Sequence, residues 1–189
     1  MAVLTISRDL GSGGREVGLM LSSSLGYRFV DRERILARLK AAGHKWEKWT
    51  EGLDEHTPRV WEKYDWSYSG FVAMVQSEIL DEAASNRVII MGRGGNYLLK
   101  GVPFALRVRI MALFEDRVAR VSEREGIDED SARWLIERTD RERAGFLLTF
   151  MAGTAKTRPI MIVSSTPRPC LLTGSPPASQ DFFRKKTVS

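Results

Sequence analysis

A glycine-rich turn close to the N-terminus limits the possible folds more than any other part of the sequence. It runs from Gly11 to Glu16 and follows an apolar, β-branched run at residues 2–6 that is typical of a buried strand. Apolar residues then recur at helical spacing over residues 17–25, and Gly26 is placed to end that helix. Such a turn presents free backbone N–H groups and the positive helix end to an anion. Taken alone, this motif favours neither of two interpretations: a phosphate-binding turn, or a tight turn that binds no ligand.

The spacing of the turn departs from the two best-known phosphate-binding loops. A loop of the Walker A type needs a Lys-Ser/Thr pair after the glycines, and this chain has none there. The dinucleotide-binding loop needs a third glycine where Glu16 stands. The turn by itself therefore does not identify a ligand.

Strand and helix patterns alternate along the next part of the chain. Three further strands are predicted at residues 27–31, 87–91 and 106–110. Helical patterns cover residues 35–39, 71–80 and about 115–148, the last interrupted near Gly126 with Asp128 placed as an N-cap. Strands that alternate with helices predict a parallel sheet covered on both faces.

The net charge of +5 comes from the end of the chain. Six of the 29 basic residues but only one of the 24 acidic residues lie in residues 154–189, so the rest carries no net charge. A neutral body is unlike a nucleic-acid-binding domain, and we expect no nucleic-acid partner. No apolar run approaches the roughly 20 residues of a membrane span, and no secretory signal pattern opens the chain. We expect one cytoplasmic domain with no membrane partner.

Several short motifs, taken in order, extend the interpretation beyond the turn. They are Thr5-Ile6-Ser7-Arg8, the turn at 11–16, Leu25-Gly26, Asp31-Arg32, Gly92-Arg93-Gly94, the strand at 106–110, the helix at 115–125 and Arg138-Thr139-Asp140-Arg141-Glu142-Arg143. In this order the motifs resemble the cytidylate kinase-like family of the P-loop nucleoside-monophosphate (NMP) kinase superfamily. The resemblance covers about residues 2–150.

The resemblance implies a fold, a reaction and a division of the chain. The implied fold is a three-layer α/β P-loop kinase domain at residues 1–153, with a helical NMP-binding region at about 44–86 and a helical lid region at about 124–150. The implied reaction moves the γ-phosphoryl group of ATP to a nucleoside monophosphate, with CMP as the expected acceptor and Mg²⁺ as the metal. A nucleotide-binding module without catalysis, an inactive truncated remnant and a kinase of another small molecule are the alternatives. The oligomeric state stays open.

The resemblance also implies roles for particular residues. The donor phosphates would be bound by the turn, at Gly11, Ser12, Gly13, Gly14, Arg15 and Glu16, with Arg15 supplying the charge of the absent lysine. The monophosphate would be bound by Asp31, Arg32 and Arg93, and the lid arginines would be Arg138, Arg141 and Arg143. Asp31 has an alternative interpretation as a helix N-cap. The arginines at 117, 120 and 124 are interpreted as surface charges paired with nearby acids.

Three positions depart from the family's pattern. Gly14 and Glu16 stand where ordinary cytidylate kinases carry lysine and Ser/Thr, and Gly94 stands where they carry an acid. The hydroxyl that normally helps to hold Mg²⁺ is therefore missing, and Glu16 either offers an oxygen ligand or repels phosphate. His44 and His56 have no ligand-spaced partners, so no protein metal site is predicted.

Two segments differ in composition from the rest. Aromatic residues crowd residues 46–68, which favours a small core or flap, with base stacking as the alternative. Residues 154–189 are rich in proline and poor in acids, which is typical of an irregular or disordered tail. Codons for residues 160–166, read one base earlier, permit a family-like strand, so a frameshift near residue 150 is the leading hypothesis. The final strand of the fold would then be missing.

Overall fold

A computed structural model of the protein describes residues 2–41 and 66–150, with side chains described up to residue 147. The described strands are β1 (Val3–Arg8), β2 (Arg28–Val30), β3 (Val88–Met91) and β4 (Ala105–Ile110). The described helices are α1 (Gly14–Leu25), α2 (Arg32–Ala41), α3 (Trp66–Ala84), α4 (Gly95–Leu98), α5 (Phe114–Glu125) and α6 (Glu129–Phe150). The predicted alternation of strands and helices is confirmed.

The strands form a four-stranded sheet in the order β2-β3-β1-β4. All three pairings are parallel, with Val3 of β1 opposite Val88 of β3 and Ala105 of β4. The carboxyl ends of the strands therefore lie along one edge of the sheet, where ligands of open parallel sheets bind. Within the described residues β4 is an edge strand, and five of its six residues are only partly buried.

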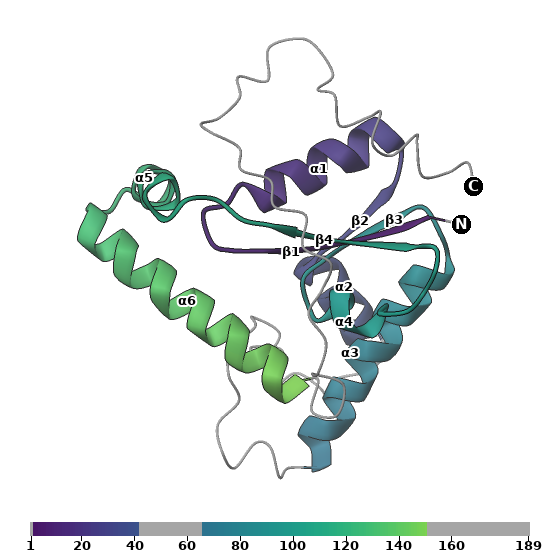
Figure 1. Ribbon diagram of the computed structural model, residues 1–189. Helices are drawn as coiled ribbons and strands as arrows, with labels where there is room; N and C mark the ends of the chain where they lie inside the picture. The colour runs from purple at the N-terminus through teal and green to yellow at the C-terminus, as the bar shows by residue number, and fades with distance from the viewer. Residues whose placement is uncertain (1, 42–65, 151–189) are drawn as a thin grey trace.

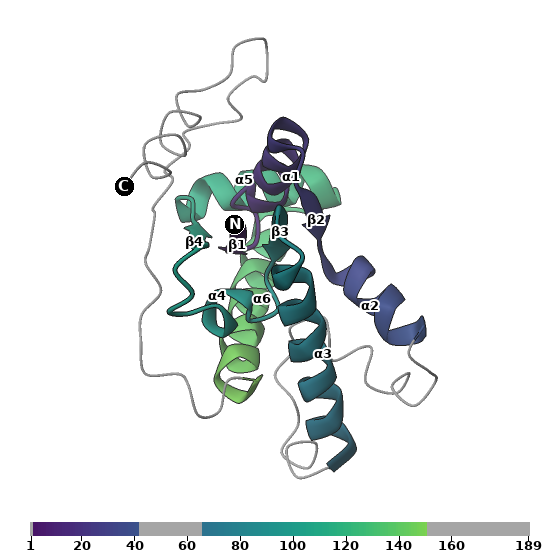
Figure 2. The same ribbon diagram turned by 90° about the vertical axis from the view of Figure 1, so that its right-hand side faces the viewer.

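Helices cover both faces of this sheet, as Figures 1 and 2 show. Helix α1 packs Val17 and Leu21 on one face, against Leu4, Ile6 and the alternate residues of the neighbouring strands. Helices α2, α3 and α4 and the end of α6 cover the other face, where the core includes Val3, Val88, Phe71, Ile79 and Phe146. The three-layer α/β prediction is confirmed.

Helices α5 and α6 form a corner at the carboxyl edge of the sheet (Figure 1). Their own small core contains Val118, Val121, Ala132 and Ile136, and Leu10 of the glycine turn packs against it. The corner is sharp because Gly126 ends α5 at a φ of 66° and Asp128 begins α6 by accepting a hydrogen bond from the Ser131 amide at 2.8 Å. The predicted interruption and N-cap are both confirmed.

One helix was not predicted from the sequence. Helix α4 is a single turn that follows Gly92-Arg93-Gly94, too short to show a helical period. Its residue Gly95 lies against β3, where an added Cβ would approach Ile90 Cγ2 to 3.0 Å.

Several predictions lie outside the described residues. These are the aromatic segment up to residue 65, about half of the proposed NMP-binding region, and the tail with its frameshift hypothesis and missing strand. The division of the chain into a domain and a tail therefore stays a prediction. In the part of the chain that is described, every helix is too short or too polar to cross a bilayer.

Candidate functional site

The glycine turn connects β1 to α1 with two residues in the left-handed region. Gly11 has a φ of 76° and Gly13, the N-cap of α1, a φ of 77°. Ser12 is buried and its hydroxyl donates to the Asp9 carbonyl at 2.8 Å, which closes the turn. The start of α1 has no side-chain cap, so its first N–H groups are available to an anion.

The shape of the turn is set by helices that come more than 100 residues later. Arg117 Nε of α5 donates to the Leu10 carbonyl at 2.7 Å, and Arg120 Nη1 donates to the Gly11 carbonyl at 3.2 Å. The Leu10 amide donates to Asp140 Oδ1 of α6 at 3.2 Å, and Asp140 also pairs with Arg117. Two carbonyls bonded to α5 and one amide bonded to α6 hold the turn in this conformation.

The predicted surface role of two arginines is therefore wrong. Arg117 is 8 % exposed and Arg120 contacts the turn rather than a neighbouring acid. Arg117 occupies the same stripe of α5 as Phe114, Val118 and Val121, and this spacing was the available signal that it faces inward.

A second turn of similar form follows β3. Gly92, Arg93 and Gly94 have φ values of 69°, 54° and 75°, and Gly94 is the N-cap of α4. A non-glycine residue in the left-handed region costs about 1 kcal/mol, so Arg93 is held there by its surroundings. Its side chain is buried.

A cavity of about 410 Å³ lies between the end of β1, the Arg93 turn and α6. It is lined by Ser7, Arg8 and Asp9 after β1, by Gly92, Arg93, Gly94, Asn96 and Tyr97 after β3, by Arg109 of β4, and by Asp140, Arg143, Ala144 and Leu147 of α6. Four arginines face two acids, so the cavity carries an excess of positive charge. Its position at the carboxyl edge of a parallel sheet is that of a substrate site.

Ion pairs hold the acids of this cavity. Arg109 Nη2 lies 2.9 Å from Asp9 Oδ1, and Arg117 Nη1 lies 3.9 Å from Asp9 Oδ2. Arg143 Nη1 reaches across from α6 to the Arg8 carbonyl, at 3.4 Å. Guanidinium groups fixed in this way match the geometry of phosphate oxygens.

Asn96 lines the cavity and connects α4 to β1 and β4 by hydrogen bonds. Its Nδ2 donates to Ser7 Oγ at 2.8 Å and to the Val108 carbonyl at 3.0 Å, while its main-chain carbonyl accepts from Arg107 Nη1 at 3.1 Å. The side chain is 4 % exposed. Asn96 thus fixes α4, and with it the Arg93 turn, against β1 and β4.

Of the residues predicted from sequence, two line this cavity: Arg93 and Arg143. Arg15 does not, because it pairs with Asp31 at 3.1 Å and lies over the Phe29 ring, 5.7 Å from its centroid. Asp31 also accepts from the Arg34 amide at 3.3 Å, as an N-cap of α2. Burial opposes its charge, but hydrogen bonds from Glu33, Arg34 and Arg15 prevail and lower the pKa of Asp31.

The remaining predicted residues, including all six of the turn at 11–16, do not line the cavity. Arg32 is the first residue of α2. Arg138 pairs with Glu142 at 2.9 Å and stacks over Trp134 at 5.1 Å, and Arg141 is exposed on the same helix. The charged or amide-bearing cavity residues not predicted from sequence are Arg8, Asp9, Asn96, Arg109 and Asp140. Arg8, Asp9 and Arg109 lie at or next to the carboxyl end of a strand, and this position was the available signal, whereas Asn96 and Asp140 lie on helices.

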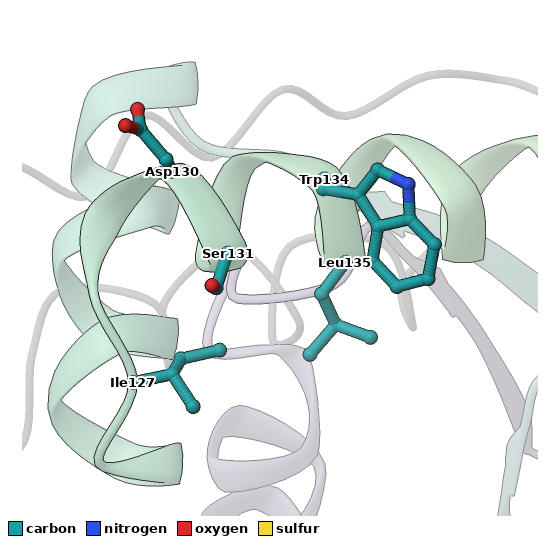
Figure 3. A pocket seen from close by; sticks show the side chains of 5 residues that line it. All are labelled: Ile127, Asp130, Ser131, Trp134 and Leu135. Carbon is teal, nitrogen blue, oxygen red and sulfur yellow. The ribbon is translucent and has the colours of Figure 1, made fainter.

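A second hollow, of about 460 Å³, lies at the α5–α6 corner (Figure 3). Ile127, Trp134 and Leu135 line it, and its polar residues are Asp130 and Ser131. The Asp130 carboxylate points away from Ile127 and Leu135 in Figure 3. With no basic lining residue, this hollow does not suit a phosphate.

Two solved structures share the fold. The chain is 17 % identical to an uncharacterised protein from Eubacterium ventriosum, with a TM-score of 0.63, over 87 % of this chain and 89 % of that one. It is 14 % identical to shikimate kinase from Bacteroides thetaiotaomicron, with a TM-score of 0.51, over 87 % of this chain and 85 % of that one. No curated protein sequence matches it.

The family model gives the assignment. The model described as the cytidylate kinase-like family matches residues 3–160, which include the glycine turn, the Arg93 turn and the whole cavity lining. The chain belongs to the cytidylate kinase-like family.

Proposed function

We propose that the protein transfers the γ-phosphoryl group of ATP to a nucleoside monophosphate, with CMP as the first candidate acceptor. The observation that carries the proposal is the arginine-lined cavity beside the glycine turn, at the carboxyl edge of the sheet. Phosphoryl transfer depends on positioning and positive charge far more than on covalent help from the protein. Family membership supports the same reaction.

The donor phosphates would lie on the turn from Gly11 to Glu16. The positive φ values of Gly11 and Gly13 bring the backbone close to a ligand, and the uncapped start of α1 directs N–H groups and the helix dipole at it. The fixed conformation that Arg117 and Arg120 impose means that little reorganisation accompanies binding.

The acceptor monophosphate would lie in the cavity, on Arg93 and Arg109. Arg143 enters the same cavity from α6 and would neutralise charge on the transferring group. The roles of four other residues stay predictions from the sequence: those of Asp31, Arg32, Arg138 and Arg141. These residues do not line the cavity, so they would reach a substrate only from outside it.

Mg²⁺ would be held mainly by the nucleotide. Among the described residues, no group of three or more side chains of the ligand types occurs. Kinase Mg²⁺ ions commonly use one or two carboxylates, phosphate oxygens and water, and the carboxylate of Glu16, exposed in the first turn of α1, fits that pattern. When bound, the ion would neutralise charge on the phosphates.

Coupled ADP-release assays over a panel of nucleoside monophosphates test the proposal. We expect turnover with at least one of them in the presence of Mg²⁺, with CMP preferred. Arg109→Met should raise the KM for the acceptor by about tenfold, as expected for loss of one charge-assisted hydrogen bond. Arg124→Ala is the matched control, because Arg124 is exposed on α5 and pairs with its neighbour Glu125.

A second function, nucleotide binding without transfer, is favoured by one specific feature. Gly14 and Glu16 remove the lysine and the hydroxyl that the family's kinases use. ATP binding by calorimetry with no ADP release for any acceptor would establish this function and contradict the kinase proposal. Absence of both binding and turnover would contradict both.

A further inference from the structure

The backbone of Gly14 does not require glycine. Gly14 is the first residue of α1, and unlike Gly11 and Gly13 it has no positive φ. The ordinary residue at this place in a helix has a side chain, and glycine costs up to about 1 kcal/mol relative to alanine. A cause outside the backbone must therefore account for the missing side chain.

The cause is Arg8, the last residue of β1. A Cβ on Gly14 would lie 2.6 Å from Arg8 Cβ and 3.1 Å from Arg8 Cγ. These Arg8 atoms are the first two of the side chain, next to a backbone that pairs with Ile110 of β4 and whose carbonyl accepts from Arg143, so they have little freedom to move. Arg8 and any side chain at position 14 exclude each other.

Position 14 is also where ordinary cytidylate kinases carry the lysine of the loop. Arg8 leaves the backbone beside that position and lines the same cavity as Arg93, Arg109 and Arg143. Its main chain is held by α6, since Arg143 donates to the Arg8 carbonyl. A guanidinium that starts where the lysine would start can reach the phosphates that the lysine would reach.

We infer that Arg8 is the phosphate-binding cation that replaces the lysine of the loop, and that Gly14 is glycine because Arg8 occupies its side-chain space. The inference deepens the proposed function and rests on it for the identity of the ligand. It assigns to Arg8 the charge that the sequence assigned to Arg15. Arg15 instead pairs with Asp31 and is 55 % exposed.

The first test is a binding measurement that needs no turnover. Inorganic tripolyphosphate and ATP are titrated by calorimetry into the full chain and its variants. Arg8→Ala should weaken binding by about tenfold or more, because a charge-assisted contact is lost, and Arg8→Lys should weaken it less. Arg124→Ala should bind as the wild type. Wild-type affinity in Arg8→Ala would overturn the inference. So would a result in which Arg15→Ala, and not Arg8→Ala, loses the affinity for tripolyphosphate and ATP.

The second test exchanges the two positions. Gly14→Lys in the wild type should lower the Tm, because its Cβ meets Arg8. Arg8→Gly alone should lose tripolyphosphate affinity, and the double variant Arg8→Gly/Gly14→Lys should regain both affinity and Tm relative to the single variants. A double variant no better than either single one would contradict the mutual exclusion. If the double variant does not fold, the effect of Gly14→Ala on the Tm is compared in two backgrounds. Gly14→Ala should lower the Tm of the wild type but not that of Arg8→Gly.

The outcomes separate this inference from the proposed function. Arg8-dependent binding of tripolyphosphate without transfer to any nucleoside monophosphate would reject the kinase and keep the inference. Full kinase turnover and ATP affinity in Arg8→Ala would keep the kinase and reject the inference. A wild type that binds neither tripolyphosphate nor ATP would reject both.

Discussion

Asp140 on α6 accepts a hydrogen bond from the backbone amide of Leu10 at 3.2 Å, across 130 residues of chain. Arg117 completes the connection, because it pairs with Asp140 and donates to the carbonyl of the same Leu10. Both polar groups of one turn residue are thus held by a single ion pair between α5 and α6. The conformation of the phosphate-binding turn is coupled to the corner that these two helices form.

Replacing Asp140 by asparagine should destabilise the protein by about 1–3 kcal/mol. The amide still accepts from Leu10, but the buried guanidinium of Arg117 loses most of its compensating charge. Asp140 is about one-third exposed, which keeps the loss below that of a fully buried pair. Urea unfolding measures the change. Glu115→Gln, which removes the exposed pair with Arg133, is the control and should change stability less.

Gly11→Ala should cost more stability than Gly26→Ala, although both glycines have a positive φ. The strain of the left-handed conformation, about 1 kcal/mol, is common to both. A Cβ at position 11 would also lie 2.8 Å from the Arg117 carbonyl oxygen, whereas position 26 has open space. The difference between the two midpoints of urea unfolding therefore measures the contact between the turn and α5. Equal losses would show that α5 moves aside without cost.

Glu82 should make the protein sensitive to acid. Its carboxylate is 1 % exposed and lies 2.8 Å from Arg34, 3.2 Å from Arg38 and 3.4 Å from Arg28. Burial opposes its charge, but the arginines, Arg34 foremost, outweigh burial and hold the pKa of Glu82 below its ordinary 4.5. A lowered pKa means that the stabilisation is complete above about pH 4.5 and is lost as the pH falls through the folded-state pKa.

The measurement is the Tm of wild type and Glu82→Gln between pH 7 and pH 3. The wild type should be more stable at pH 7, and its advantage should shrink as the pH falls below about 4.5. An advantage that stays constant down to pH 3 would mean that the charge of Glu82 is not what stabilises α2 against α3.

Asn96→Ala should destabilise by about 1–3 kcal/mol, since it removes the partly buried bonds from Asn96 Nδ2 to Ser7 Oγ and the Val108 carbonyl and leaves the longer bond from Ser7 Oγ to that carbonyl, at 3.4 Å. It should also weaken acceptor binding, because Arg93 precedes the helix that Asn96 fixes. Urea unfolding and the KM for the acceptor are the two readouts. A loss of stability with an unchanged KM would separate Asn96 from the site.

The sequence predicted the fold well because its signals are local. Apolar β-branched runs, helical spacing and the glycines at 26 and 126 each act within a few residues, and all four strands are where they were expected. The turn at 11–16 was recognised for the same reason. Arg93 was identified because Gly92-Arg93-Gly94 resembles a motif of the family.

The parts of the site that sequence reasoning missed depend on contacts between distant residues. Arg117 was interpreted as a surface charge on a helix rich in charged residues, yet its partners are Leu10 and Asp140. Arg15 looked like the substitute for a lysine because it follows the glycines, yet the adjacent strand and helix supply Phe29 and Asp31 to hold it. Sequence spacing alone does not show which partners Arg117 and Arg15 take in the folded protein.

The bonds from Arg117, Arg120 and Asp140 to the turn also bear on how the protein is made. A ribosome releases Leu10 and Gly11 long before it releases α5 and α6, so the nascent turn has no partners to fix its carbonyls. Nucleotide in the cell can stabilise only chains in which that site exists. Early intermediates would therefore gain nothing from ATP, and the first ligand-protected state would appear only after α6 has emerged.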